Sequence, residues 1–328
     1  MLIDSYARPI TYLRISLTER CNLRCVYCVP ENTPQIQTVK PKLTSDEFVQ
    51  VASIMAQNGL KYIRLTGGEP LVHPDIIEIV SRLSSIPNIE EVSLTTNAML
   101  LEKLALPLAK AGLRRVNISL DTLDPEKFRK ITRGGKIEKV WDGIDAALDA
   151  GLTPIKINTV VVNGLNDNEL NEIASLSLTK DIHVRFIELM PVGNSQSWGP
   201  GFPVGDDRYM SVQEMLQNLE PLKVQPSLGP VGNGPSRTYK IPGAKGTIGF
   251  ITPVGEHFCN NCNRLRLTAD GFLRPCLLMD EELNVLEALR GKTSILPIIK
   301  KAIELKPKGH ELHLNHLPES RRMAQIGG

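Results

Sequence analysis

Six cysteines fall into two groups of three that lie far apart in the chain. The first group has the spacing C-x3-C-x2-C, and the second has C-x2-C followed by a third cysteine after thirteen residues: Cys21, Cys25, Cys28 and Cys259, Cys262, Cys276. A closed electron-transfer cluster takes four cysteine thiolates. Three thiolates hold three corners of a four-iron cluster and leave the fourth iron open. The two triads therefore indicate two [4Fe–4S] clusters that each accept a further ligand.

Two other uses of six cysteines remain open at this point. Three disulfides are one, but Met1–Ile10 lacks the basic start and apolar run of a signal peptide. The expected location is therefore the cytoplasm, where thiols stay reduced and clusters are commoner than disulfides. A zinc knuckle is the other, and it would need a fourth ligand near the first triad. The nearest downstream histidine, His73, is too far along the chain for a compact local site.

The composition is that of a globular chain with nearly balanced charge. Of the 328 residues, 41% are hydrophobic, which is enough for a sizeable core. Lysine and arginine number 38 against 36 acidic residues, so the bulk charge indicates no nucleic-acid partner. No stretch approaches the roughly 20 apolar residues of a membrane span, and no membrane partner is expected.

Short β-branched runs alternate with helical segments in the first part of the chain. Thr44 and Glu47 have the spacing of a capping box that starts one helix, and Gly59 marks its end. Further helices are expected from Pro74, Met99, Val140 and Glu169. This alternation predicts right-handed βα units and an α/β fold built on an open, six-stranded parallel (β/α)6 partial barrel. The expected strands are Tyr12–Leu17, Tyr62–Thr66, Glu91–Thr96, Arg115–Leu120, Ile155–Val162 and His183–Met190.

The character of the sequence changes after about residue 192. Pro191–Pro242 is rich in Pro, Gly, Asn and Ser, and only Ser211–Leu219 within it has the pattern of a helix. This predicts a loop-rich connector that packs along the barrel. We expect a partial-barrel domain at 1–225. At 226–328 we expect a C-terminal extension that closes the barrel mouth and carries the second iron–sulfur site.

The first triad follows the first expected strand, at the face where barrel enzymes place their active sites. Tyr27 puts an aromatic ring between its last two cysteines, and Thr66–Pro70 (TGGEP) stands at the end of the second expected strand. Together these motifs resemble those of the radical S-adenosylmethionine (SAM) superfamily. In that superfamily the cysteines hold a [4Fe–4S] cluster, and the backbone of the glycine-rich edge receives the amino group of SAM.

The second triad is similar to that of the GTP 3′,8-cyclase family. The similarity rests on Phe258–Thr268 (FCNNCNRLRLT), Asp270-Gly271 and Arg274–Cys276. Other similar segments are Asn117–Asp121, Arg185–Met190, Gly193-Asn194 and the terminal Met323–Gly328. The resemblance covers nearly the whole chain. It implies a lyase that converts GTP to 3′,8-cyclo-7,8-dihydroguanosine triphosphate in molybdenum cofactor biosynthesis.

Two arginines after the second triad share one face of an extended segment. Arg264 and Arg266 alternate with leucines, and two guanidinium groups beside a cluster suit phosphate oxygens. A solvated strand face is the alternative, since charged residues often alternate on half-exposed strands. The resemblance assigns to GTP the residues Arg14, Arg64, Thr95, Lys156, Arg264 and Arg266. It assigns to SAM the residues Tyr27, Gly68, Ser119 and Met190.

The resemblance also implies a mechanism. The reduced first cluster cleaves SAM, the resulting 5′-deoxyadenosyl radical takes the 3′ hydrogen of GTP, and the ribose closes onto C8 of guanine. The second cluster holds the purine at its open iron. The expected catalytic residues are Arg264, Arg266, Gly327 and Gly328. A diglycine can thread a narrow cavity, and the resemblance implies that this tail reaches into the active site.

Several partners are expected from this chemistry. An electron-donating reductase, flavodoxin or ferredoxin would reduce the first cluster, a second copy of the chain would form a homodimer, and the next enzyme of the pathway would take the product. Two rival functions remain. A peptide-modifying radical SAM enzyme would usually carry more C-terminal cysteines, and a non-enzymatic zinc or iron–sulfur module would not need the GGEP motif. His310, His313 and His316 are expected to be surface histidines, because no carboxylate cluster accompanies them.

Overall fold

The computed structural model of the chain describes residues 1–29, 41–190, 198–229, 234–255, 258–310, 312 and 321–327. Six central strands run parallel and adjacent to one another in chain order, as the alternation of elements predicts. Their starts agree with the expected ones to within one residue. They are β1 (Tyr12–Ser16), β2 (Tyr62–Thr66), β3 (Glu91–Thr96), β4 (Arg115–Ser119), β5 (Ile155–Val161) and β6 (Ile182–Glu188).

Helices follow the strands and cover one side of the sheet. The first helix starts at the expected capping box, in which Glu47 N–H donates to Thr44 Oγ1 at 3.2 Å and Thr44 N–H donates to the Glu47 carboxylate at 2.8 Å. Such reciprocal bonds satisfy backbone donors that the first helical turn leaves unpaired. The helices are α1 (Ser45–Gln57), α2 (Ile76–Ser84), α3 (Leu101–Lys110), α4 (Pro125–Thr132), α5 (Ile137–Asp149) and α6 (Leu170–Thr179).

Side chains alternate between the two sides of the central strands. Leu13 and Leu65 are fully buried and belong to the main hydrophobic core together with Met55 of α1. The strand positions next to these leucines carry Arg14 on β1 and Arg64 on β2. Both arginines line a cavity on the other side of the sheet. The apolar core therefore lies between strands and helices, and the concave side of the sheet is left polar.

The C-terminal part of the chain extends this sheet at both edges. β9 pairs in parallel with β6, and β10 pairs in parallel with β1. The open parallel barrel is confirmed, but its strand count of six is approximate. In the described part of the chain the sheet has twelve strands, in the order β12-β11-β10-β1-β2-β3-β4-β5-β6-β9-β8-β7. The added strands are β7 (Gln225–Pro226), β8 (Arg237–Lys240), β9 (Thr247–Ile251), β10 (Arg264–Leu267), β11 (Phe272–Arg274) and β12 (Leu283–Asn284).

The segment expected to be loop-rich contains more structure than its composition indicates. Its expected helix is confirmed as α7 (Val212–Asn218), which Ser211 caps. Besides this helix, the loop-rich segment contains β7 and β8, which form an antiparallel pair. Their partners lie at the sheet edge, so the local sequence carries little sign of them.

The polypeptide then crosses the open side of the sheet. Residues 252–255 and 258–263 belong to the connection from β9 at one edge of the central strands to β10 at the other, and the second of these ranges carries Cys259 and Cys262. After β12 come α8 (Leu286–Arg290) and α9 (Leu296–Glu304), and α9 packs on β11 and β12.

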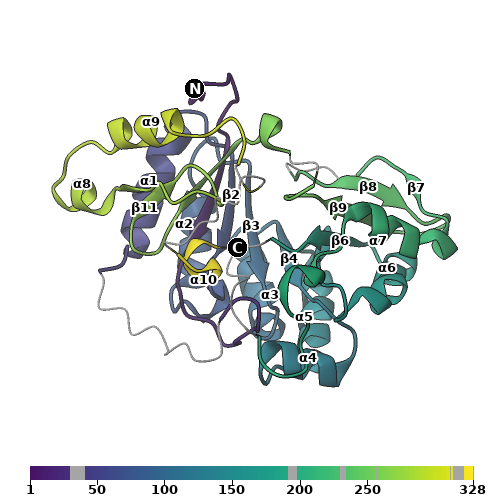
Figure 1. The fold of residues 1–328 in the computed structure, drawn as a ribbon. Coiled ribbons are helices and arrows are strands. Elements are labelled where there is room, and N and C mark those ends of the chain that lie inside the picture. The colour runs from purple at the N-terminus through teal and green to yellow at the C-terminus, as the bar shows by residue number, and fades with distance from the viewer. Residues whose placement is uncertain are drawn as a thin grey trace.

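The C-terminus returns to the middle of the molecule. Figure 1 shows α8, α9 and β11 at one end and β7, β8 and β9 at the other, with the short helix α10 (Met323–Ile326) and the C-terminus between them. Among the described helices, none combines the length and the apolar character that crossing a bilayer requires.

Candidate active site

A cavity of about 320 Å³ lies on the polar side of the central strands. Its size is that of a small-molecule site. Most of the predicted site residues line it, namely Arg14, Cys21, Cys25, Tyr27, Cys28, Arg64, Gly68, Thr95, Ser119, Met190, Arg264 and Arg266. Others are not part of the lining, namely Lys156, Gly327, Cys259, Cys262 and Cys276. Gly328 lies outside the described residues.

The first triad lies in the loop directly after β1. Cys28 N–H donates to the Cys25 carbonyl at 2.9 Å, which folds this part of the loop into a turn. The glycine pair after β2 packs against the start of the loop, where Gly68 N–H donates to the Thr18 carbonyl at 2.7 Å. A Cβ on Gly68 would lie 2.3 Å from the Arg20 carbonyl oxygen. A residue without a side chain is therefore needed for the glycine-rich edge to reach the cysteine loop.

Glu69 ties the ends of β2 and β3 together beside this triad. Its carboxylate accepts hydrogen bonds from Thr96 Oγ1 at 2.7 Å, from Asn97 N–H at 2.8 Å and from Leu71 N–H at 3.0 Å. Burial nevertheless raises the pKa of Glu69 to about 7. The Asn97 amide also approaches Cys21 Sγ, at 3.8 Å. The first triad therefore has an acidic residue as a close neighbour.

Tyr27 is held at the cavity by a second carboxylate. Its hydroxyl donates to Asp121 Oδ2 at 2.5 Å, and Val160 N–H donates to Asp121 Oδ1 at 2.9 Å. Burial is the main cause that raises the pKa of Asp121 to about 6. The Tyr27 ring also makes an edge contact with Trp198, with 6.2 Å between ring centroids. Neither Asp121 nor Trp198 was singled out from the sequence as a site residue.

Three arginines stand side by side across neighbouring strands. The register aligns Arg14 of β1 with Arg64 of β2 on one side and with Arg266 of β10 on the other. Burial is the first cause of the lowered pKa of all three. No carboxylate forms an ion pair with them in the part of the chain that the structure describes. The alternative of a solvated strand face does not hold for Arg266, which is buried.

Polar atoms without partners line the same cavity. The Thr95 hydroxyl and the Asn158 amide oxygen are buried and have no hydrogen-bond partner among the described residues. Arg185 lines the cavity as well, and burial and then neighbouring cations lower its pKa to about 9. The sequence reasoning missed Asn158 and Arg185 as site residues. Each side chain points to the cavity side of its strand. The alternation of side chains along β5 and β6 was therefore the signal in the sequence that could have identified them.

Lys156 stands two residues before Asn158 on β5, one pleat further from the carboxyl end of the strand. It is 2% exposed. Burial, followed by the nearby charges of Arg185, Arg115 and Arg64, lowers its pKa to about 6. Lys156 thus adds to the cation cluster from behind the cavity lining.

The second triad lies directly behind the cavity, because its neighbours Phe258, Arg264 and Leu277 line it. Lys306, which follows α9 and is 3% exposed, donates from Nζ to the Arg264 carbonyl at 2.8 Å and to the Pro275 carbonyl at 2.9 Å. Burial raises the pKa of Cys262, but the charges of Lys306 and Arg264 outweigh this effect and the net shift is downward. Cationic groups therefore surround the second triad.

Arg8 fastens the same loop from the N-terminal end of the chain. Its Nη1 donates to the Cys259 carbonyl at 2.6 Å and to the Lys308 carbonyl at 3.0 Å, and its Nη2 donates to the Pro307 carbonyl at 2.5 Å. Asp4 pairs with Arg8 Nε at 2.6 Å. The sequence reasoning missed Arg8 and Lys306, since each is a single cation in a segment without a motif.

The tail also reaches the cavity, where α10 contributes Met323 and Ala324 to the lining. Arg266 Nη1 donates to the carbonyls of Ile326 at 3.0 Å and of Gly327 at 2.5 Å. Gly327 has φ +66°, and a Cβ on it would lie 2.3 Å from Thr66 Cγ2. Arg266 therefore binds the tail in addition to lining the cavity, a contact that the sequence did not indicate.

His310 corrects the expectation of three surface histidines. It is 7% exposed, and its Nε2 lies 2.7 Å from the Pro253 carbonyl oxygen. His313 and His316 lie outside the described residues. Within the described ranges, no three His, Cys, Asp or Glu side chains are grouped as ligands of a single metal ion.

The donor set has the chemistry of iron–sulfur ligation. All six cysteines are free thiols. Thiolates are the protein ligands of iron–sulfur clusters. Each triad includes a tight turn, since Cys262 N–H donates to the Cys259 carbonyl at 3.1 Å much as Cys28 does to Cys25. Two thiol triads, one at the cavity and one behind it, fit a pair of iron–sulfur clusters.

Comparisons with known proteins agree with this arrangement. Residues 15–177 match the radical SAM superfamily, and residues 182–312 match the family described as Molybdenum Cofactor Synthesis C. A GTP 3′,8-cyclase of Petrotoga mobilis is 44% identical over 330 residues, which is 100% of both chains. One from Listeria monocytogenes is 46% identical over 100% of this chain and 99% of its own. One from Pelotomaculum thermopropionicum is 47% identical over 99% of each chain.

Solved structures show the same fold at lower identity. Streptococcus suis SuiB bound to S-adenosylmethionine has a TM-score of 0.59 and 16% identity, over 85% of this chain and 64% of SuiB. The cavity, the cysteine triads and the full-length matches lead to one assignment. The chain belongs to the GTP 3′,8-cyclase family of the radical SAM superfamily.

Proposed function

We propose that this chain converts GTP to 3′,8-cyclo-7,8-dihydroguanosine triphosphate in molybdenum cofactor biosynthesis, with SAM and two [4Fe–4S] clusters as cofactors. The observation that carries the proposal is the cavity in which the first cysteine triad faces a row of arginines, two of them buried and one partly buried, that have no carboxylate partners among the described residues. The named relatives match the whole chain, which argues against a peptide-modifying enzyme and against a zinc module.

The cysteine triads would hold the clusters. Three thiolates from one loop would bind the first cluster at the cavity, and the other three would bind the second cluster behind it: Cys21, Cys25, Cys28 and Cys259, Cys262, Cys276. When bound, a reduced cluster and SAM supply one-electron chemistry that breaks a carbon–sulfur bond and starts hydrogen abstraction from the ribose. The chain itself orients the reactants and keeps water away from them.

The charge pattern supports a division of the cavity between the two small molecules. SAM carries a sulfonium and an amino group, which suit the side that holds Glu69 and Asp121. The SAM ligands would be Tyr27, Gly68, Ser119 and Met190. A triphosphate suits the arginine row, because charge-assisted bonds to phosphate are strong and a buried cation is costly without an anion. The GTP ligands would be Arg14, Arg64, Thr95, Lys156, Arg264 and Arg266.

The tail would act in catalysis by placing SAM and GTP for hydrogen abstraction. Gly327 lies between Thr66 of β2 and Arg266 of β10, close to both halves of the cavity. We propose the same role for Gly328. Arg264 and Arg266 would act with the tail as catalytic residues.

The wider setting of the enzyme is also a proposal. We propose a partial-barrel domain at 1–225 and an extension at 226–328, a cytoplasmic location and a homodimer. The electron donor would be a reductase, flavodoxin or ferredoxin. The next enzyme of the pathway would take the product.

One experiment tests the proposed function directly. Reconstituted, reduced protein is incubated anaerobically with SAM and GTP, and the products are separated by chromatography and identified by mass. We expect 5′-deoxyadenosine together with a GTP isomer, and neither when GTP is replaced by CTP. Formation of 5′-deoxyadenosine with no modified nucleotide under these conditions would refute the assignment to GTP.

A further inference from the structure

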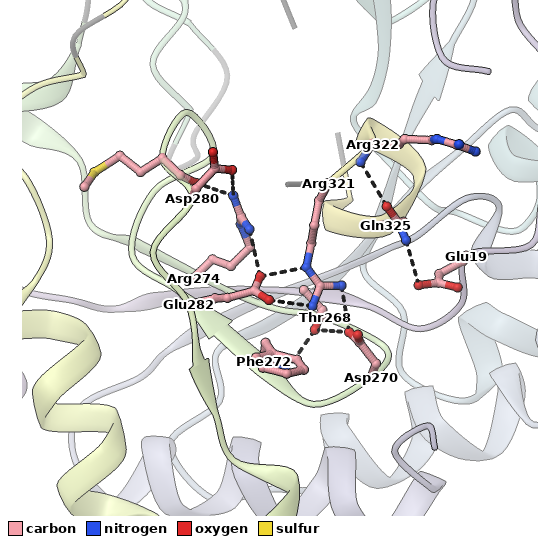
Figure 2. Close-up of polar contacts among 11 residues, drawn as sticks. Glu19, Thr268, Asp270, Phe272, Arg274, Asp280, Glu282, Arg321, Arg322 and Gln325 are labelled. Atoms are coloured by element: carbon pink, nitrogen blue, oxygen red, sulfur yellow. Dashed lines mark hydrogen bonds and ion pairs between the residues drawn. The ribbon is translucent and has the colours of Figure 1, made fainter. Parts of the chain in front are cut away.

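Arg321, the first described residue of the tail, has a buried guanidinium group. Its acidic partners lie in the two connections on either side of β11. Its Nε and Nη2 donate to the two carboxylate oxygens of Glu282, at 2.7 Å each, and its Nη1 donates to Asp270 Oδ1 at 2.9 Å. Arg321 is 8% exposed and lies over the Phe272 ring, 5.0 Å from its centroid. Figure 2 shows this arrangement. Two parallel bonds to one carboxylate fix both position and orientation.

The same acids hold the strand that leads to the second triad. Glu282 Oε2 also accepts from Arg274 Nη1, at 2.8 Å, and Arg274 is fully buried two residues before Cys276. Asp270 Oδ1 accepts from Thr268 Oγ1 at 2.6 Å as well. Two arginines and two carboxylates therefore form a charged cluster beneath the tail, and Asp280 lies at its edge, 3.9 Å from Arg274 Nη2 (Figure 2). We call Arg321, Glu282, Asp270 and Arg274 the anchor cluster.

Beyond Arg321, the tail contacts the loop that carries the first triad. Gln325 Nε2 donates to Glu19 Oε1 at 3.3 Å, as Figure 2 also shows, and Glu19 stands two residues before Cys21. The backbone of Ala324 lies close to the Cys28 thiol. The few residues from 321 to 327 thus connect the second triad's strand with the first triad's loop.

Such a short helix cannot hold this position by itself. α10 has four residues, and isolated helices of that length are unstable because nucleation fixes more dihedrals than it forms hydrogen bonds. The end of the tail is held by Arg266, and its start is held by Arg321. Arg266 belongs to the cavity lining, whereas Arg321 and Gln325 hold the described tail through residues outside that lining, Arg321 with three hydrogen bonds and Gln325 with one of 3.3 Å.

We propose that Arg321 is a positioning residue that anchors the C-terminal tail to the anchor cluster and so sets the place of α10 between the two cysteine triads. The catalytic consequence rests on the proposed function, in which the tail places SAM and GTP. The anchor itself does not, because it is a property of the folded chain. Loss of the anchor leaves both triads and the cavity cations intact but frees the tail.

The first test measures the anchor without catalysis. Arg321→Lys keeps the positive charge but loses the two-pronged contact, and hydrogen–deuterium exchange of the reconstituted holoenzyme is followed by peptide. We expect peptides covering 321–327 to exchange at least tenfold faster than in the unmodified protein, with no change in β1 or β2. The matched control is Arg322→Lys, since Arg322 is the next residue and is exposed; its exchange should not change. Unchanged tail exchange in Arg321→Lys overturns the proposal.

The second test separates positioning from a general structural role. Glu282→Gln weakens the contacts of both Arg321 and Arg274, so it should free the tail and also speed exchange around β11. Arg321→Lys should leave β11 and the spectrum of the second cluster as they are. If Arg321→Lys instead destabilises β11 or loses iron, Arg321 is a structural residue of the extension and the positioning role is wrong.

Activity then tests the link to function. In Arg321→Lys we expect kcat for the GTP product to fall at least tenfold, with dissociation constants for SAM and GTP within threefold of normal. Arg322→Lys should keep normal values. If the tail exchanges faster but kcat is normal, the anchoring by Arg321 is supported. The catalytic role of the tail would then be refuted.

Discussion

The first cysteine triad is supported mainly from the ends of neighbouring parallel strands, whereas the second is held by residues from opposite ends of the chain. Gly68 and Glu69 meet the first triad's loop from β2. Arg8 and Lys306 hold the second triad through backbone carbonyls at Cys259, Arg264 and Pro275. The glycine-rich edge that meets the first triad is a motif in the sequence, whereas Arg8 and Lys306 are single cations in segments without a motif.

The two triads also differ in charge. Burial and the neighbouring Cys21 raise the pKa of Cys28 to about 11, and burial raises the pKa of Cys21, with the charge of Glu69 as a smaller cause. At the second triad, Lys306 and Arg264 outweigh burial and lower the pKa of Cys262. One chain thus builds an acidic and a cationic environment on either side of one cavity, which suits a cationic cofactor and an anionic substrate.

The largest expected effect comes from removing one triad at a time. Cys25→Ala and Cys262→Ala should each abolish product formation and lower the iron content from about eight to about four, because each cubane needs all three of its thiolates. The measurement is iron analysis with electron paramagnetic resonance of the reduced protein. If either change removed both clusters from folded protein, the two triads would not be independent sites.

Blocking the tail should be almost as severe. In Gly327→Ala, the new Cβ would meet Thr66 Cγ2 at 2.3 Å and would also strain a backbone at φ +66°. Product formation should fall at least tenfold, and deletion of both terminal glycines should do the same, while iron content and GTP affinity stay near normal.

Gly243→Ala is the matched control for the tail, since Gly243 has φ +79° but a Cβ added to it would meet no atom within 4 Å. It carries the backbone strain without the clash, so its activity should remain. Equal losses in the two variants would show that strain alone, and not the place of the tail, explains the effect.

Lys306 tests the long-range support of the second triad. Lys306→Met removes a buried cation and two charge-assisted hydrogen bonds, each of about 1.5–3 kcal/mol. We expect the second cluster to be lost within minutes on exposure to a chelator while the spectrum of the first persists. Lys308→Met, which changes an exposed lysine two residues on, should behave normally. Equal loss of both clusters would contradict the separate support of the triads.

The arginine row should affect GTP more than SAM. Arg14→Ala removes a charge-assisted phosphate contact worth about 1.5–3 kcal/mol, so the GTP dissociation constant should rise ~10–100-fold. SAM affinity in the same protein is the internal control, and Arg114→Ala, an exposed arginine, is the external one. Arg266→Ala should show the same weakening and, in addition, faster exchange of the tail. If direct titration showed an unchanged affinity for GTP, the row of arginines would not bind the triphosphate and its role would be structural.

The smallest expected effect is a proton taken up with GTP. The pKa of Lys156 is lowered from 10.5 to about 6, so the amine is mostly neutral at pH 8. A bound triphosphate favours the charged form, and up to one proton should be taken up per GTP at that pH. Calorimetry in buffers of different ionisation enthalpy measures this uptake, and Lys156→Met should abolish it.

The same group has a defined effect on stability. Because the folded pKa of Lys156 lies below the unfolded value, the unfolded chain binds more protons between pH 6 and 10.5. This group therefore makes the ligand-free protein more stable as the pH rises through that window. The measurement is the free energy of unfolding as a function of pH. If it changed with pH equally in Lys156→Met and in the unmodified protein, the lowered pKa would be contradicted.

Much of the site could be predicted because it depends on neighbours along the chain. The period of two in β1 and β2 places Arg14 and Arg64 on one side and leucines on the other, and the capping box of Thr44 and Glu47 starts α1 within one turn. The spacing of the first triad likewise acts over a few residues, and the glycines after β2 form a recognisable motif at a strand end. By contrast, the sequence alone could not decide whether Arg266 is buried in a site or lies on a solvated strand face.

The tertiary structure decided what lies beside what across the whole chain. The pairing of Tyr12 with Arg264 puts Arg14 next to Arg266, and the crossing from β9 to β10 brings the second triad behind the cavity. The contacts of Arg8, Lys306 and Arg321 join segments that share no local pattern. Hydrogen bonds at sheet edges and buried charge pairs form wherever the folded chain brings partners together. Their positions therefore depend on the global path of the backbone, which no local period records.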